Sequence, residues 1–363
     1  MLKDWPKRFL TLDLKYFERQ LEYFKKSYNV ITLNEYYNIK SGSSVSPQNP
    51  LVITIDDGYL DNWIWAFPLL KKYNLPATIF VSPEMVDTRS IVRPNLEDLW
   101  KGKTTKGELS VNGYMSWDEM KIMTTNGLIN FQSHTMSHTK YFVSDRITGF
   151  HHPGADCIYP IGNLFPELKP FYISNPDFEK KVPYGTPFFE WRSSIVAKKV
   201  DINPDFVNEC VQALKGLDLS NYDFKTAFNK VEPVYNDYRK DGKIILSTES
   251  DEAHKKRVLY ELVDSKNIIE EKLNTKVEFL AWPHGDHTEE LHELALKSGY
   301  KATTTGNLKA GERSDRIGPR IGIRIYYKNL MFDTMRLDLK IKAFKGNGVA
   351  GFVKSIYKAF KGG

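Results

Sequence analysis

Two pairs of side chains with metal-binding or proton-transferring chemistry stand far apart in the chain. Asp56 and Asp57 are adjacent and precede Gly58, and His134 and His138 are four residues apart. Carboxylates at the end of an apolar run are costly unless a cation neutralises them, although Asp-Gly alone is also a common surface turn. Two imidazoles at this spacing can bind one ion, from a helical face or around a tight turn. Two histidines and one aspartate suit Zn²⁺ or another divalent first-row metal, and the second carboxylate is free to act on water.

Both pairs directly follow predicted strands. The apolar residues 51–55 lead into the aspartates, and residues 128–133 lead into the first histidine. Strands alternate with amphipathic helices, which predicts a parallel sheet or barrel. Sites in such folds form at the carboxyl ends of the strands, so the two pairs are expected to converge. The further elements expected are helices at 13–28, 62–73, 117–126, 252–272 and 289–298, a short helix capped by Asn34, and strands at 30–33, 77–81, 277–282, 301–305 and 320–323.

The rhythm of strands and helices breaks between two halves of the chain. We expect residues 1–140 and 249–335 to form the two parts of one barrel, with 141–248 as an insertion that packs near the site. The insertion is rich in aromatic residues and proline, with helices expected at 204–214 and 223–238. Residues 336–363 form a basic tail with an apolar stripe, which predicts a terminal helix docked on the body, or alternatively a membrane-surface helix.

Bulk composition favours a globular protein and excludes several classes. Of the 363 residues, 41% are hydrophobic and 26% charged, which is unlike a disordered chain. The net charge of +6 is spread along the chain, so we predict no nucleic-acid partner. Two cysteines are too few for a disulfide framework, and no apolar run is long enough to span a membrane. Without a signal-like start, the expected location is cytoplasmic, with peripheral membrane contact through the tail as a further expectation.

The motifs carry a resemblance to a known family. Residues 54–58, Thr-Ile-Asp-Asp-Gly, and 134–138, His-Thr-Met-Ser-His, resemble two motifs of the polysaccharide deacetylase family, carbohydrate esterase family 4, with its NodB-like homology domain. Residues 280–285, Leu-Ala-Trp-Pro-His-Gly, are similar to a third motif. The resemblance covers roughly residues 10–140 and 250–325. It implies an α/β fold, a distorted (β/α) barrel, with the insertion after the second motif.

The resemblance also implies roles for individual residues. Asp57, His134 and His138 would hold the metal, most simply Zn²⁺, and Asp56 would be the general base that activates water. Arg320, in a Pro-Arg motif, would orient that base, although an ordinary ion pair explains it equally well. The substrate side would be lined by residues of the three motifs: Tyr59, Thr135, Trp282 and Pro283.

One expected catalytic group is missing from its usual place. The family commonly supplies a general acid from a Leu-x-His motif near the C-terminus, or from a Tyr-His motif before the first helix, and neither is found here. The alternatives are a start upstream of Met1, an acid from elsewhere, or an impaired protein. His284 in the third motif is the best in-chain candidate, ahead of His151 and His152, although it could instead line the substrate groove.

The function implied is removal of N-acetyl groups from amino sugars of a surface polysaccharide or its precursor by a metal-dependent hydrolase of carbon–nitrogen bonds. Two alternatives stay open: hydrolysis of a small amide, and a carbohydrate-binding pseudoenzyme that lacks the general acid. Trp191 and Arg192 in the insertion could line a sugar subsite, although core packing of the indole is the simpler interpretation.

Overall fold

The centre of the fold is a six-stranded sheet in which all pairings are parallel. The computed structural model describes residues 12–110, 112–306, 317–323 and 329–344. The strand order is β12-β11-β10-β5-β4-β3. The strands are β3 (Thr54–Ile55), β4 (Ala77–Val81), β5 (Ile129–Ser133), β10 (Phe279–Ala281), β11 (Ala302–Thr305) and β12 (Ile317–Pro319). The sheet with its helices forms a half-barrel, as the α/β prediction required.

Helices cover the sheet, and their apolar faces form its core. Leu21 and Phe24 of α1 are buried in one cluster with Leu70 of α3 and Ile79 of β4, which fixes α1 against the body. The helices of this body are α1 (Leu14–Ser27), α2 (Leu33–Lys40), α3 (Phe67–Tyr73), α4 (Leu96–Trp100), α5 (Trp117–Thr125), α9 (Asp251–Leu259), α10 (Ser265–Leu273), α11 (Glu289–Lys297) and α12 (Leu330–Phe344). Single π-helical stretches at Asn62–Ala66 and Tyr260–Asp264 join α3 and α10 to the chain before them.

Three local predictions were wrong in detail. The run 51–55 is two short strands: β2 (Pro50–Leu51) pairs with β1 (Asn29–Val30), and β3 pairs with β4. The chain therefore pairs with β1 at residues 50–51 and then joins the six-stranded sheet at residues 54–55, just before the aspartates. The helix expected to be capped by Asn34 begins at Leu33, because Thr32 forms the capping box with Glu35. The last strand of the sheet is 317–319 and not 320–323, so Arg320 directly follows it.

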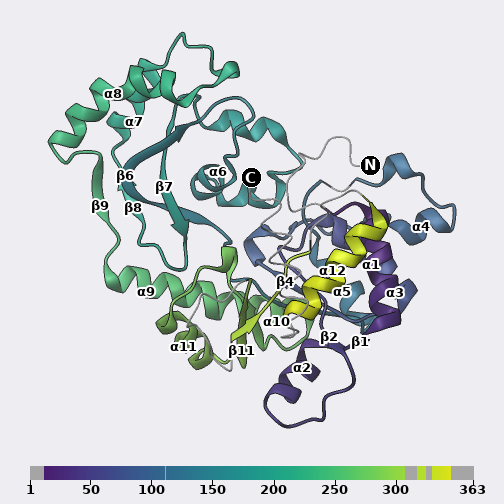
Figure 1. The fold of residues 1–363 in the computed structure, drawn as a ribbon. Coiled ribbons are helices and arrows are strands. Elements are labelled where there is room, and N and C mark those ends of the chain that lie inside the picture. The colour runs from purple at the N-terminus through teal and green to yellow at the C-terminus, as the bar shows by residue number, and fades with distance from the viewer. Residues whose placement is uncertain (1–11, 111, 307–316, 324–328, 345–363) are drawn as a thin grey trace.

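The inserted segment builds a unit with its own small sheets. β6 (Lys140–Phe150) and β7 (Pro187–Ser193) pair in antiparallel fashion, as do β8 (Val200–Ile202) and β9 (Ile245–Thr248). The sequence did not predict these antiparallel pairs. α7 (Pro204–Ala213) and α8 (Phe224–Lys240) pack on it around a separate apolar core, and α6 (Ile158–Leu164) belongs to a third cluster. Figure 1 shows these teal elements set beside the main sheet.

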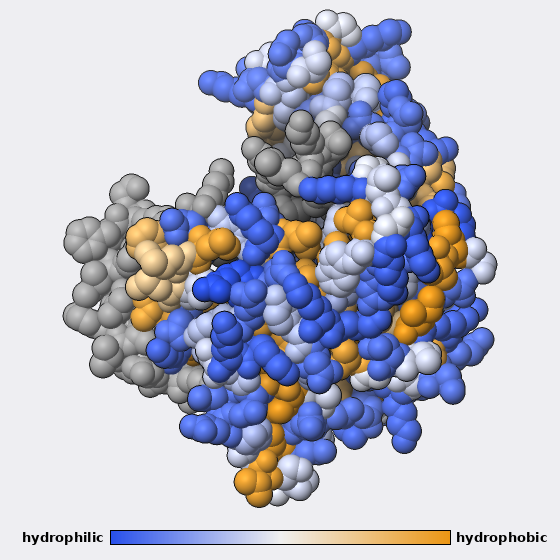
Figure 2. Space-filling view, turned by 90° about the vertical axis from the view of Figure 1, so that its right-hand side faces the viewer, coloured by the Kyte–Doolittle hydropathy of each residue, from blue (hydrophilic) through white to orange (hydrophobic). Residues whose placement is uncertain are grey.

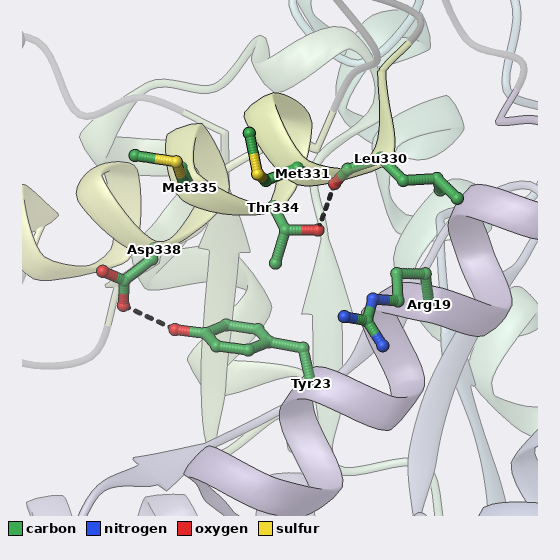
Figure 3. A pocket seen from close by; sticks show the side chains of 7 residues that line it. All are labelled: Arg19, Tyr23, Leu330, Met331, Thr334, Met335 and Asp338. Carbon is green, nitrogen blue, oxygen red and sulfur yellow. Dashed lines mark hydrogen bonds between the residues drawn. The ribbon is translucent and has the colours of Figure 1, made fainter.

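The last described helix, α12, lies along α1. Tyr23 donates a hydrogen bond of 2.5 Å to Asp338, and a pocket opens between the two helices (Figure 3). Its lining contains none of the residues predicted for the site. The apolar stripe predicted for the tail lies beyond residue 344, outside the described residues, and nothing in the described part supports the membrane contact expected from it. Among the described helices, none is long and apolar enough to cross a membrane. The face drawn in Figure 2 is mostly hydrophilic, with apolar side chains in small groups.

Candidate metal centre

Four strands end at one edge of the sheet and deliver the predicted site residues there. Asp56 follows β3, His134 follows β5 and Arg320 follows β12. The third motif follows β10 in the same way. Because all pairings are parallel, these carboxyl ends share one edge. Strand order, and not distance in sequence, therefore brings the motifs together.

Three side chains converge on one point. Oδ1 of Asp57 lies 3.3 Å from Nε2 of His134 and 3.2 Å from Nε2 of His138, and the candidate ligand atoms all lie within 4.8 Å of one another. Nδ1 of His134 lies 2.7 Å from the carbonyl oxygen of Ala281, so this nitrogen must be the donor. The lone pair on Nε2 of the neutral ring then faces the carboxylate, which favours a cation between them. The donor set, two imidazoles and one carboxylate, suits Zn²⁺ or a similar divalent ion.

The pKa values at the three groups reflect their mutual electrostatics. Burial alone would raise the pKa of Asp57, but the neighbouring charges of His138 and His134 lower it well below its usual range. Burial opposes protonation of both rings. It lowers the pKa of His138, whereas the contact with Asp57 outweighs burial and raises the pKa of His134. The partly buried carboxylate of Asp57 therefore stays ionised and needs a positive partner, which a divalent cation would supply.

The backbone is strained where these side chains converge. Seven described non-glycine residues have positive φ, and three of them are asparagines, which tolerate this conformation. The other four are all predicted site residues: Asp57, Thr135, His138 and His284, with φ between 44° and 72°. Left-handed backbone at non-glycine residues is unfavourable and clusters at functional sites. The strained residues therefore indicate a functional site at this edge of the sheet.

Asp56, the aspartate outside the triad, is paired with an arginine. The guanidinium of Arg320 contacts Asp56 through two hydrogen bonds of 2.6 and 2.9 Å. It also donates to Thr54 Oγ1 at 3.3 Å and lies over the ring of Phe80. A bidentate pair of this kind fixes the plane of the carboxylate. The structure thus brings the predicted base and the predicted orienting arginine together in the expected geometry.

Comparison with known proteins agrees with this arrangement. Residues 44–150, which contain both the aspartate and the histidine motif, match the family model described as polysaccharide deacetylase. The resemblance that the motifs predicted is therefore confirmed for this segment of the chain. A curated relative, the putative polysaccharide deacetylase YxkH of Bacillus subtilis (strain 168), is 26% identical over 130 residues. The match covers 36% of this chain and 38% of the relative, so the chain matches well under half of the relative's length.

Solved structures share the fold of this chain. A de-N-acetylase from Aggregatibacter actinomycetemcomitans superposes with a TM-score of 0.53, covering 91% of this chain and 93% of that one, at 17% identity. The BpsB deacetylase domain from Bordetella bronchiseptica gives a TM-score of 0.50, with 88% of each chain covered, also at 17% identity. At this identity the likeness shows the fold. It extends over the inserted segment as well as the matched motifs.

His284 lies beside the triad, and its side chain is exposed. Its ring centroid is 4.6 Å from that of His138, and its Nε2 is 3.5 Å from the hydroxyl of Tyr159 in the insertion. Partial loss of solvent and the charges of His138 and Lys140 lower the pKa of His284. A cation at the triad would lower it further. The resting ring is therefore neutral, which favours the alternative that it lines the groove over the role of general acid.

The four residues expected to touch substrate are placed differently from one another. Tyr59 is partly exposed, and its ring stacks on Tyr114 at 5.1 Å. Thr135 is buried in the turn between the two histidines. Trp282 is only 1% exposed and packs in the main core, and Pro283 is buried as well. Direct contact of Trp282 with a sugar is therefore contradicted, because its indole packs in the core just after the fully buried strand β10.

One important residue gave no signal in the sequence. Glu261, in the π-helical stretch before α10, is 1% exposed, and its carboxylate accepts hydrogen bonds from the backbone of Met136 and Ser137 at 2.9 and 3.0 Å. The hydroxyls of Ser137 and Ser194 donate to its other oxygen. It therefore fixes the turn that carries both histidines. Only the tertiary structure shows this, since 124 residues separate Glu261 from Ser137.

Proposed function

We propose that this chain is a metal-dependent hydrolase that removes N-acetyl groups from amino sugars of a surface polysaccharide or of its precursor. The observation that supports it most is the pairing of two differently held carboxylates at one strand edge. Asp57 faces two imidazoles, while the neighbouring Asp56 is clamped by Arg320. A metal site that only binds has no need of a second, oriented carboxylate. A hydrolase needs it to accept a proton from water.

The residues divide the reaction between them. Asp57, His134 and His138 would hold a divalent cation, which when bound would polarise the acetyl carbonyl and promote attack by water. Asp56 would take a proton from the attacking water at one of its carboxylate oxygens, and Arg320 would keep those oxygens in place. Water adds to the amide carbon, the carbon–nitrogen bond breaks, and acetate and a free amine leave. The amine must receive one proton as this bond breaks.

The inserted segment supplies groups on the substrate side. Tyr159 packs edge-on against His284 and Trp191, with ring centroids 5.8 and 5.4 Å apart, and the amino group of Lys140 lies over its ring. Because the resting imidazole of His284 is neutral, we assign delivery of the proton to the Tyr159 hydroxyl, which lies 3.5 Å from Nε2 of that ring. A phenol keeps its proton to about pH 10. The aromatic wall would also suit the apolar face of a sugar ring.

The proposal is tested by acetate release from purified protein, with Zn²⁺ added, on a panel of N-acetylated glycans and small N-acetyl amides. We expect release from glycans, and more from oligomers than from single sugars. Release from small amides alone would identify the alternative carbon–nitrogen hydrolase. Binding of glycans without release, at full metal content, would identify a pseudoenzyme and overturn the proposal.

Removing the phenol of Tyr159 tests the assignment of proton delivery. The Tyr159→Phe variant keeps the ring that packs on Trp191 and loses only the hydroxyl beside His284. We expect kcat for acetate release to fall about 100-fold with KM nearly unchanged, in the range of lost general acid catalysis. The matched control is Tyr184→Phe, whose hydroxyl bonds Glu179 within the insertion, and it should keep wild-type kcat. A Tyr159→Phe variant with unchanged kcat would contradict the assignment.

A further inference from the structure

The inserted segment reaches the back of the metal centre through one buried lysine. Lys169, in the 3₁₀ turn Pro166–Phe171, is 5% exposed, and its amino group forms an ion pair with Glu84, just after β4. The same nitrogen lies 3.4 Å from the carbonyl oxygen of Ser137, in the turn that links His134 and His138. A charge from the insertion thus contacts the segment that carries two candidate metal ligands.

The same turn is held from its other sides by the main body. The hydroxyl of Ser82 donates to the carbonyl oxygen of His134 at 2.7 Å. The backbone N–H of Glu84 donates to the carbonyl oxygen of Met136 at 3.1 Å. Glu261 accepts from the two amides described above. Lys169 completes this set by contacting the Ser137 carbonyl. Both the N–H and the C=O groups of residues 136 and 137 therefore have hydrogen-bond partners.

The fit of the lysine depends on a neighbouring glycine. A Cβ atom added at Gly162, in α6, would lie 2.9 Å from Cγ and 3.0 Å from Cε of Lys169. The absence of a side chain at this position lets the aliphatic stem pass against the helix. Position 162 thus offers a way to displace the lysine without removing its charge.

A buried lysine is a poor choice if stability alone is required. Removing an ammonium from water is expensive, and apolar residues of similar size often replace buried ion pairs without loss of stability. We infer that Lys169 is a positioning residue for the metal centre, through which the inserted segment sets the geometry of the His134–His138 turn. This inference rests on the proposed function only in that the triad binds a metal. Groups that orient ligands in this way typically change metal affinity by 10- to 100-fold when lost.

The test compares metal affinity in full-length variants, by competition between the protein and a chelator for Zn²⁺. Lys169→Met keeps the volume and apolar stem and removes the amino group. We expect its Zn²⁺ dissociation constant to rise 10- to 100-fold. Glu84 keeps its hydrogen bond from Tyr260 and partial contact with solvent, so Tm should fall by only a few degrees.

The matched control is Lys266→Met. This partly buried lysine also pairs with a carboxylate and a carbonyl, those of Glu270 and Val277, but at the amino end of β10, away from the site. It should leave the affinity unchanged.

Two further measurements keep the inference falsifiable if Lys169→Met folds poorly. Gly162→Ala retains the charge and should weaken Zn²⁺ binding in the same direction. In the metal-free protein, hydrogen exchange at the amides of Met136 and Ser137 should be faster in either variant than in Lys266→Met. Unchanged affinity and exchange in folded Lys169→Met would overturn the inference. A wild-type protein that binds Zn²⁺ but releases no acetate would instead overturn the proposed function and leave this inference standing.

Discussion

The Asp56→Asn variant is expected to keep its metal and to release acetate about 10²- to 10⁴-fold more slowly than the wild type, as general base catalysis is lost. The amide has the size and shape of the carboxylate, and its oxygen can still accept a hydrogen bond from Arg320. It cannot take a proton from water at neutral pH. Asp57 and the two histidines are untouched, so about one Zn²⁺ per chain should remain.

Two measurements together make this result specific. Metal content by elemental analysis separates loss of the base from loss of the ion, and kcat reports the chemistry. The control is Asp118→Asn on α5, a surface carboxylate that pairs with Ser90 and Lys121, which should leave both unchanged. If Asp56→Asn released acetate at the wild-type rate with a full complement of metal, another group would have to be the base.

The convergence of the two motifs could be predicted because it follows from local rules. Asp56 and His134 each come directly after a predicted strand, and parallel strands end at a common edge. The pairing of Asp56 with Arg320 depends on strands at opposite ends of the sheet order, β3 and β12. Only the resemblance to a Pro-Arg motif suggested it, and an ordinary ion pair was equally compatible with the sequence.

The rest of the site could not be read from the sequence, for physical reasons. Glu261 and Lys169 form hydrogen bonds with backbone groups of the turn between His134 and His138. Any residue can offer a backbone amide or carbonyl. No pattern of residue types therefore marks the contact. Trp282 shows the opposite problem, because its motif suggested a substrate contact while the strand end turned it into the core. Its indole is one of the largest fully buried side chains of the described part.

The inserted segment illustrates a third limit of the sequence. Its many aromatic residues predicted packing near the site. The antiparallel pair of β6 and β7 was missed because its register shifts interrupt the alternation of side chains. Its contacts with the site, through Tyr159 and Lys169, come from a helix and a 3₁₀ turn with little periodicity of their own. The approach of these two residues to the triad depends on how the unit packs against the main sheet.

The largest effect on binding is expected from removing both imidazoles of the triad. The His134→Ala, His138→Ala double variant should retain well under a tenth of the metal bound by the wild type, since the Asp57 carboxylate alone would hold a divalent ion weakly. Ion binding stabilises only a chain that binds it, so saturating Zn²⁺ should raise Tm of the wild type and not of the variant. The gain at 100 times the dissociation constant is about 2.7 kcal/mol.

A second pair of histidines provides the control for this experiment. His152 stacks on Tyr222 in the insertion, and His254 lies on α9. Neither belongs to the triad of Asp57, His134 and His138. The His152→Ala, His254→Ala variant has the same loss of imidazoles and should keep both its metal and its thermal response. If the first double variant bound as much metal as the second, the ion would lie elsewhere. If the wild type bound none, another cation would be needed to explain the ionised, partly buried carboxylate of Asp57.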